Sequence, residues 1–256
     1  RLNRWIKLRL GWLFFQRSRS KPAEVAASLR EHMRRQLGDS YDAADFEPPY
    51  NPWDQRLCLV PDGDLFAAIR DGSVRVVTER ITSFAPEGVR LASGALLPAD
   101  VVVTATGLRL QIGGGIQVSL DGQPIEWERH WFYRNCMFSG VPNLAVVFGY
   151  LNASWTLRAD MVADYVCRVL RHMGEVGARV AVPELPEGHA MAEDNIIIYS
   201  SGYLQRAKPL MPKSAGALPW RLNQNFLEDQ RDYRQRPVAD GVLRFLPGMV
   251  KRRELS

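Results

Sequence analysis

The apolar run that ends at Gly107 constrains the fold more than any other stretch of this chain. Its sequence is PADVVVTATGLRL, from Pro98 to Leu110, with three valines in succession. Continuous β-branched runs are typical of strands that are covered on both faces, as the strands of parallel sheets are. PNLAVVFGY, at 142–150, has the same character and leads into a helical pattern. Two buried strands, one followed directly by a helix, predict an α/β fold.

Apolar residues at helical spacing predict two helices. The first starts after Ser20, has Pro22 in its first turn and stops at Gly38, and the second runs from NASW at 152–155 to about Gly174. Their apolar stripes are Val25, Leu29, Met33 and Leu37 in the first helix and Leu157, Met161, Tyr165, Val169 and Met173 in the second.

Shorter patterns predict the remaining elements. Residues 2–16 are helical in character, although Gly11 weakens any long helix there, and the Pro-rich residues 46–61 form a structured loop. We further expect a helix at 62–72, a strand at 73–77, a hairpin over 81–98 with a Pro-Glu-Gly turn, a turn at Asp121-Gly122 and a helix within 223–235.

The net charge of +5 is concentrated at one end of the chain. Residues 1–35 hold ten Lys and Arg against two acidic residues, whereas the remainder holds 23 against 26. A nucleic-acid-binding protein usually spreads its basic surface more widely, so we expect no nucleic-acid partner. No apolar run reaches the length of about eighteen residues that a spanning helix needs.

Cysteine and histidine spacing argues against a metal site or a disulfide framework. Cys58, Cys136 and Cys167 show no CxxC spacing, and the four histidines show no ligand pattern. We expect each cysteine to be a small core residue in a protein of the reducing cytoplasm.

The loop YNPWDQRLC, at 50–58, is a first candidate for chemistry. Asp54 and Arg56 stand two positions apart, so an extended backbone would project both to one side. A guanidinium is charged at any working pH and can stabilise a developing oxyanion. A structural Arg–Asp pair or a solvated loop explains the same residues and is favoured without further context.

The start of the second long helix is another candidate. Unpaired N–H groups and a partial positive charge suit an electron-rich ligand there, and Asn152, Ser154 and Thr156 add side-chain oxygens. The simpler interpretation is that Ser154 caps the helix. GxGxxG, the Walker lysine motif and GxSxG are all absent from the sequence, so it contains no phosphate loop or nucleophile elbow.

Four longer stretches carry a resemblance to a known family. YNPWDQRLCLVPDGDLFAAIR, PADVVVTATGL, SGVPNLAVVFGYLNASWTLRAD and LPWRLNQNF closely resemble type I Baeyer–Villiger monooxygenases. The ethionamide-activating flavin monooxygenases are the most similar branch, and the resemblance extends from about residue 1 to Phe245.

The resemblance implies the C-terminal half of a flavoprotein with two dinucleotide-binding, Rossmann-like domains, one for FAD and one for NADPH. Residues 1–48 then correspond to a helical insertion, 49–104 to the returning part of the NADPH domain, and 105–256 to the returning part of the FAD domain with a C-terminal tail. The family's two GxGxxG loops precede the position of Arg1, so the phosphate loops are expected in a missing N-terminal half.

The resemblance also implies roles for individual residues. Arg56 corresponds to the catalytic arginine, while its neighbour Asp54 has no assured role. The expected cofactor-binding residues are Thr106 and Gly107 at the crossing between the domains, Asn152, Ala153, Ser154, Trp155 and Thr156 beneath the pyrimidine edge of the flavin, and Trp220 and Asn225 in a loop that closes over the nicotinamide.

The implied reaction is a monooxygenation. NADPH reduces FAD, the reduced flavin traps O2 as a C4a-peroxide, and the peroxide attacks a ketone or a soft sulfur or nitrogen centre, as in a thioether or thioamide. Two alternatives remain. The chain could be a non-catalytic remnant or partner-binding fragment that binds no cofactor alone, or residues 1–21 could be a basic amphipathic segment on a membrane surface.

Overall fold

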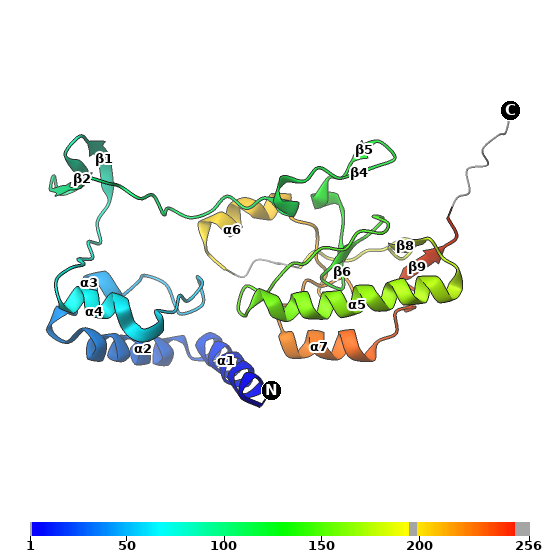
Figure 1. Ribbon diagram of the computed structural model, residues 1–256, viewed down its shortest axis with the longest axis horizontal. Helices are drawn as coiled ribbons and strands as arrows, with labels where there is room; N and C mark the ends of the chain where they lie inside the picture. Colours follow the sequence, from blue (N-terminus) through cyan, green and yellow to red (C-terminus); the bar gives the residue numbers. More distant parts are fainter. Residues whose placement is uncertain (1, 195–198, 249–256) are drawn as a thin grey trace. The chain divides into compact units, whose positions relative to one another are not determined.

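The computed structural model describes residues 2–194 and 199–248. Two compact units divide between Leu108 and Arg109 (Figure 1). Residues 2–48 lie in the same unit as residues 49–108. The assignment of the units to an insertion, an NADPH domain and an FAD domain stays a prediction.

The first unit begins with two long helices. The helix α2 (Pro22–Leu37) confirms the predicted helix, with Val25 and Leu37 buried and Gly38 at its C-terminal cap. The helix α1 (Leu2–Ser20) runs through Gly11 without a break, so Ser20 ends α1 and Lys21 takes the N-cap position of α2. Shorter helices follow at η1 (Gly38–Ser40), α3 (Ala43–Phe46), η2 (Pro61–Gly63) and α4 (Asp64–Arg70).

The sheet of the first unit is an antiparallel meander of β1 (Ile81–Ala85), β2 (Gly88–Leu91) and β3 (Leu96–Pro98). It confirms the predicted hairpin and adds a third strand. Gly88 has φ +147°, and a Cβ there would overlap the carbonyl of Leu97, so the turn requires glycine. The strand predicted at 73–77 is wrong, since those residues belong to no strand.

The apolar run at 101–107 does not form the buried strand that its sequence predicts. It lies in irregular backbone, with Val101 79% and Val103 83% exposed. A central strand needs hydrogen-bonding neighbours on both sides, and no strand within the described ranges pairs with it. The prediction depended on neighbouring strands that the described residues do not provide there.

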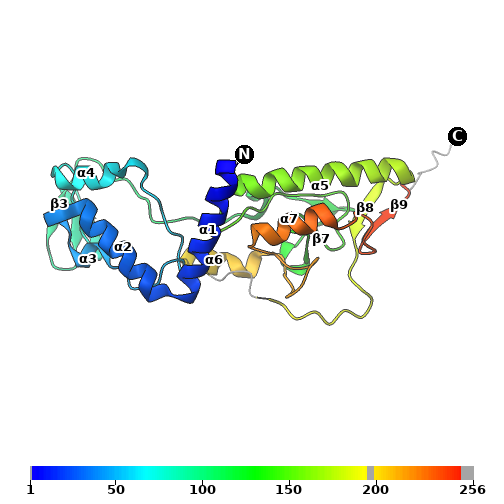
Figure 2. The same cartoon turned by 90° about the horizontal axis from the view of Figure 1, so that it is seen from below.

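The second unit is built around a long helix, α5 (Trp155–Val176), with α7 (Phe226–Gln235) running beside it (Figure 2). Both confirm predicted helices, although α5 ends at Gly177, in the left-handed conformation, rather than near Gly174. The smaller elements are η3 (Ile112–Gly115), β4 (Ser119–Leu120), β5 (Gln123–Pro124), η4 (Trp127–Arg129), β6 (Phe132–Tyr133), β7 (Met137–Phe138), β8 (Val180–Pro183), α6 (Gly202–Ala207), η5 (Lys208–Leu210) and β9 (Leu243–Leu246).

The named strands of the second unit pair in antiparallel fashion, β4 with β5, β6 with β7 and β8 with β9, and an isolated parallel bridge joins Trp131 to Lys213. The turn between β4 and β5 lies at Asp121 and Gly122, as predicted. Residues 142–150 belong to no strand, and Val147 is 45% exposed, so the second predicted parallel strand is also wrong for this chain. The described residues thus form a mixed helix and sheet structure with short antiparallel pairs.

The core of the second unit lies between the buried face of α5, the β6–β7 hairpin, α7 and the β8–β9 pair. Its members include Tyr133, Cys136, Val162, Tyr165, Val169, Trp220, Tyr233 and Leu243. Cys136 is buried as expected, but Cys58 and Cys167 are exposed, so the core prediction is wrong for two of the three cysteines. None of the described helices is long and apolar enough to cross a membrane.

Candidate functional site

A glycine holds the loop before α5 against the start of that helix. Gly149 is buried, and a Cβ at this position would overlap the indole of Trp155. Trp155 is 47% exposed, and its ring lies 6.1 Å from that of Phe148. Only glycine lets the backbone pass this close to the ring.

The start of α5 is open and carries no side-chain cap within the described residues. Ser154 stands at the N-cap position, but its hydroxyl lies 2.8 Å from that of Thr156 and accepts from no backbone N–H. The expected cap by Ser154 is therefore wrong. Ser154, Trp155 and Thr156 are all exposed, so the helix start presents its N–H groups and partial positive charge to an electron-rich group.

The loop before α5 meets the loop before α7 at Gln224. Asn152 Nδ2 donates to the Gln224 carbonyl at 3.0 Å, and the Leu151 N–H donates to Gln224 Oε1 at 2.8 Å. Gln224 Nε2 is buried and has no hydrogen-bond partner in the described part of the chain. The structure thus brings together two stretches, 152–156 and 220–225, that the sequence indicated separately.

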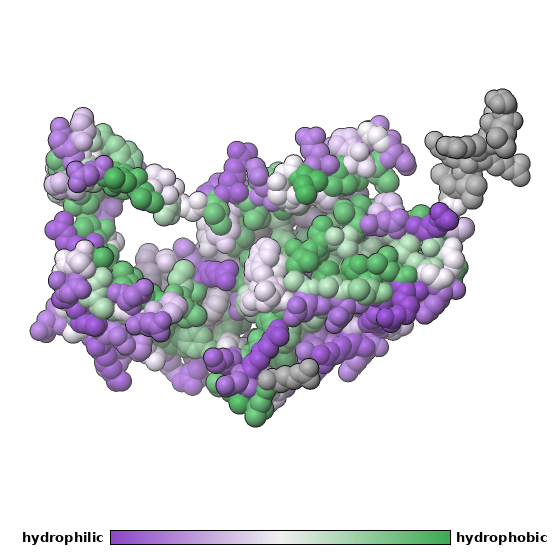
Figure 3. Space-filling view, in the orientation of Figure 1, coloured by the Kyte–Doolittle hydropathy of each residue, from purple (hydrophilic) through white to green (hydrophobic). Residues whose placement is uncertain are grey.

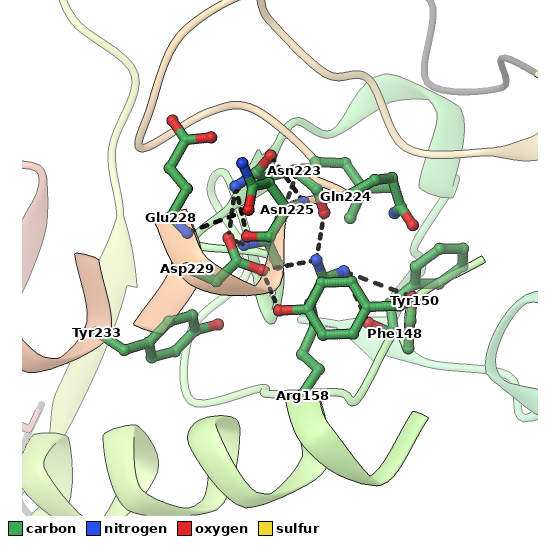
Figure 4. A network of polar contacts seen from close by, with 12 residues as sticks. Phe148, Tyr150, Arg158, Asn223, Gln224, Asn225, Glu228, Asp229 and Tyr233 are labelled. Atoms are coloured by element: carbon green, nitrogen blue, oxygen red, sulfur yellow. Dashed lines mark hydrogen bonds and ion pairs between the residues drawn. The ribbon is translucent and has the colours of Figure 1, made fainter. Parts of the chain in front are cut away.

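A buried ion pair holds the loop before α5 and the loop before α7 together (Figure 4). Arg158 on α5 and Asp229 on α7 are both fully buried, with Arg158 Nη2 2.7 Å from Asp229 Oδ2. Arg158 also donates to the carbonyls of Phe148, at 3.0 Å, and Asn223. One guanidinium therefore ties α5, the loop before it and the loop before α7 to the same carboxylate.

Asp229 is satisfied by several further donors. The Tyr150 hydroxyl donates to Oδ2, and the amides of Asn223 and Asn135 donate to Oδ1 at 2.9 and 3.3 Å. Burial raises the pKa of Tyr150 well above its ordinary value, which keeps this hydroxyl a donor. A buried carboxylate with this many donors carries its charge without an unsatisfied oxygen.

A second buried network lies one turn further along α7. Arg134 pairs with Asp232 at 2.9 Å and with Asp240 at 3.1 Å, and the Tyr133 hydroxyl donates to Asp240 at 2.7 Å. Burial opposes ionisation of Asp240, but hydrogen bonds from the Leu243 N–H and Tyr133 among others leave its pKa lowered. This network fixes the β6–β7 hairpin against α7.

Trp220 and Asn225 have structural contacts in the described chain. Trp220 is 4% exposed and packs edge-on against Tyr133, with the ring centroids 5.5 Å apart. Asn225 caps α7, its side-chain oxygen accepting from the N–H groups of Leu227 at 3.1 Å and Glu228 at 3.4 Å. Their expected role at the nicotinamide stays a prediction.

The remaining expected site residues belong to the first unit. Arg56 is exposed, and its side chain makes no hydrogen bond or ion pair with any described residue. Asp54 lies in a turn and pairs with Arg19 at 2.8 Å, so the backbone between Asp54 and Arg56 does not have the extended form on which their expected projection to one side depended. Thr106 and Gly107 are exposed, and Gly107 has φ +108°, a conformation that favours glycine.

Comparison with known proteins finds similar monooxygenases. The FAD-containing monooxygenase EthA of Mycobacterium tuberculosis is 46% identical over 225 residues, 88% of this chain and 46% of the relative. The probable FAD-binding monooxygenase AlmA of an Acinetobacter species is 43% identical over 224 residues, 88% of this chain and 45% of the relative. EthA of Mycolicibacterium smegmatis is 41% identical over 245 residues, 95% of this chain and 50% of the relative.

Over the part they share, the chain is similar to FAD-containing monooxygenases. It spans about half the length of the curated relatives that it matches, and the shared part is their C-terminal half. No protein-family model matches the chain, and no solved structure matches it.

The sequence did not predict the buried pair of Arg158 and Asp229. A signal for Arg158 exists, because it stands four, seven and eleven positions before Val162, Tyr165 and Val169, which are buried on α5. A charged residue on the buried side of a helix needs a buried partner. Sequence spacing alone does not identify that partner as Asp229.

Proposed function

We propose that this chain forms part of an FAD- and NADPH-dependent monooxygenase. Its reaction is the insertion of one oxygen atom of O2 into a ketone, as in Baeyer–Villiger oxidation, or the oxidation of a soft sulfur or nitrogen centre such as a thioether or thioamide. One observation carries the proposal: the open, uncapped start of α5, in a chain 46% identical to an FAD-containing monooxygenase.

The residues at the start of α5 fit the pyrimidine edge of a flavin. The edge is electron-rich and becomes anionic on reduction, and the N–H groups of the first helical turn and their dipole favour such a group. Ala153, Ser154, Trp155 and Thr156 would line it, and Asn152 would hold the loop at Gln224. When bound, FAD reduced by NADPH supplies the activated oxygen.

The phosphates of the cofactors need a further element. A dinucleotide pyrophosphate is usually held by a glycine-rich loop at a helix start, and the sequence contains no GxGxxG. The chain matches less than half of the EthA relative from Mycobacterium tuberculosis. We infer that cofactor retention depends on the part of such a protein that this chain does not match.

Arg56 is proposed as the catalytic residue. Its permanent charge would stabilise the oxyanion that forms when a carbonyl is attacked, and its exposed guanidinium is not committed to another described residue. Thr106 and Gly107 would contact the cofactors. Trp220 and Asn225 would anchor the loop that closes over the nicotinamide.

We place the protein in the cytoplasm. Cys58 and Cys167 are exposed free thiols, and such thiols persist in reducing compartments. This localisation suits a reaction that draws on NADPH.

Two flavin measurements test the proposal. The purified chain should bind FAD weakly when titrated, because it lacks a phosphate loop. The coding sequence upstream of residue 1 should contain two GxGxxG loops in frame, and the extended protein should show a flavin absorption band and oxidise NADPH. Absence of flavin from an extended protein that contains those loops would contradict the proposal.

A second function is favoured by the exposed apolar residues of the first unit. Val101 and Val103 are 79% and 83% exposed, as expected of a fragment that binds a partner rather than a cofactor. The same experiment separates the two functions. An upstream sequence without glycine loops, with no flavin in the purified protein, would assign the chain to partner binding.

A further inference from the structure

The outer side of α1 carries apolar side chains that the described residues of its own unit leave uncovered. Leu2, Ile6, Leu10 and Leu13, here called the α1 stripe, are 73%, 39%, 58% and 53% exposed. Their spacing of four, four and three residues places them on one side of the helix. Exposed leucines are common singly, but a row along a helix indicates a binding surface.

The opposite side of α1 fixes the direction in which the stripe points. Phe15 is 8% exposed and packs edge-on against Trp53, with ring centroids 5.3 Å apart. Arg19 pairs with Asp54 at 2.8 Å from the same side. The helix is thus attached to its own unit by one face, and the stripe lies on the other.

The α1 segment is basic, although Arg17 and Lys21 pair with Glu24 and Arg19 pairs with Asp54. Residues 2–23 hold six Lys and Arg and no Asp or Glu. Arg9 lies over the ring of Trp5 at 4.7 Å, and Trp5 is itself 54% exposed. Figure 3 shows apolar and hydrophilic side chains side by side at the free end of α1.

We propose that α1 lies in the surface of an anionic lipid bilayer, with the α1 stripe at the boundary of the acyl chains. Apolar side chains, basic residues and an interfacial Trp on one helix are the features of such segments. The aliphatic stems of Lys7 and Arg9 can remain along the apolar surface while their charged ends reach the headgroups. Since α1 is too polar to cross a membrane, the helix would lie along the surface.

The charge favours a lipid surface over a second copy of the chain. Two copies joined through the α1 stripe would bring Lys7 and Arg9 of each copy close together, and the like charges would repel. Anionic headgroups supply the missing negative charge. Binding of α1 to a lipid surface does not depend on the cofactors or the reaction of the protein.

Vesicle binding by the full 256-residue chain tests the proposal. The chain should sediment with vesicles of equal parts phosphatidylcholine and phosphatidylglycerol, and much less with phosphatidylcholine alone. Added salt should weaken the binding, because it screens the attraction to the headgroups. Lys7→Gln should lower the affinity for the anionic vesicles about fivefold.

The apolar contribution has a matched control. Leu10, in the stripe, is 58% exposed, and Leu170, on α5, is 60% exposed. Leu10→Gln should lower vesicle affinity about tenfold, while Leu170→Gln should leave it unchanged, with equal far-ultraviolet circular dichroism in both variants. No binding to anionic vesicles, or equal losses in the two variants, would overturn the proposal. Self-association without vesicles that Leu10→Gln abolishes would assign the stripe to a second copy.

Discussion

Arg56 has no described partner, and its exposed guanidinium stands among irregular backbone. In a flavin-containing protein that includes this chain, Arg56→Ala should still allow NADPH to reduce the flavin, because hydride transfer depends on positioning. Oxygenation of a ketone should fall on the order of 100-fold, with hydrogen peroxide released instead, because the oxyanion loses its counter-charge. Stopped-flow absorbance and product analysis measure the two steps separately.

Arg56→Lys should also be impaired, because lysine keeps the charge and loses the planar fork. Arg75→Ala is the matched control, since Arg75 is likewise exposed in the irregular backbone of the same unit. Normal product yield from Arg56→Ala would return Arg56 to the role of a solvated loop residue.

Asp229 is a residue on which stability depends. Asp229→Asn leaves the fully buried Arg158 without its counter-charge. The expected loss in the free energy of unfolding is about 3–5 kcal/mol, as for other broken buried pairs. Urea denaturation of the chain measures it.

Glu31→Gln provides the comparison. It breaks the pair of Glu31 with Arg35, whose side chains are 52% and 75% exposed, and should cost less than about 1 kcal/mol. Equal losses in Asp229→Asn and Glu31→Gln would show that burial does not set the strength of the Arg158–Asp229 pair.

The two helices that begin beside each other differ in how they are capped. Asn225 accepts two backbone N–H groups at the start of α7, whereas Ser154 accepts none at the start of α5. Asn225→Ala should therefore destabilise the chain by about 1 kcal/mol, and Ser154→Ala should leave its stability nearly unchanged. Thermal unfolding of both variants makes the comparison, and a larger loss in Ser154→Ala would contradict the observed geometry.

At the scale of the whole second unit, several protonated groups are buried together. Burial raises the pKa of Cys136 to about 12, and it raises those of Tyr133, Tyr165 and Tyr233 as well. Between pH 9, the ordinary value for the thiol, and about 12, the folded state keeps protons that the unfolded state loses. The stabilisation is complete below that range and is lost as the pH rises through it.

The free energy of unfolding should thus fall with rising pH by up to about 1.4 kcal/mol per pH unit for each such group. Urea midpoints across the alkaline range measure this dependence. Cys136→Ala should make it shallower, and Cys58→Ala, at an exposed thiol, should leave it unchanged. Identical profiles for both variants would show that the Cys136 thiol does not contribute.

Local periodicity accounts for what could be predicted of the fold. The stripes of α2 and α5, the hairpin of β1 and β2 and the cap at Gly38 all depend on residues a few positions apart. The two predicted parallel strands failed for the opposite reason. Hydrophobic runs indicate that a segment can be buried, but burial of a strand requires partners elsewhere in a sheet.

The same distinction applies to the candidate site. The sequence alone indicated that a helix starts at 152–156 and that another lies within 223–235. The resemblance assigns the first to the flavin and Trp220 and Asn225 to the nicotinamide, and both assignments stay predictions. Only the tertiary structure decided that Asn152 meets Gln224, that Arg158 pairs with Asp229 seventy-one positions away, and that Asp54 binds Arg19. Helical spacing is set by bonds between near neighbours, whereas these contacts depend on how distant segments pack, which no local pattern specifies.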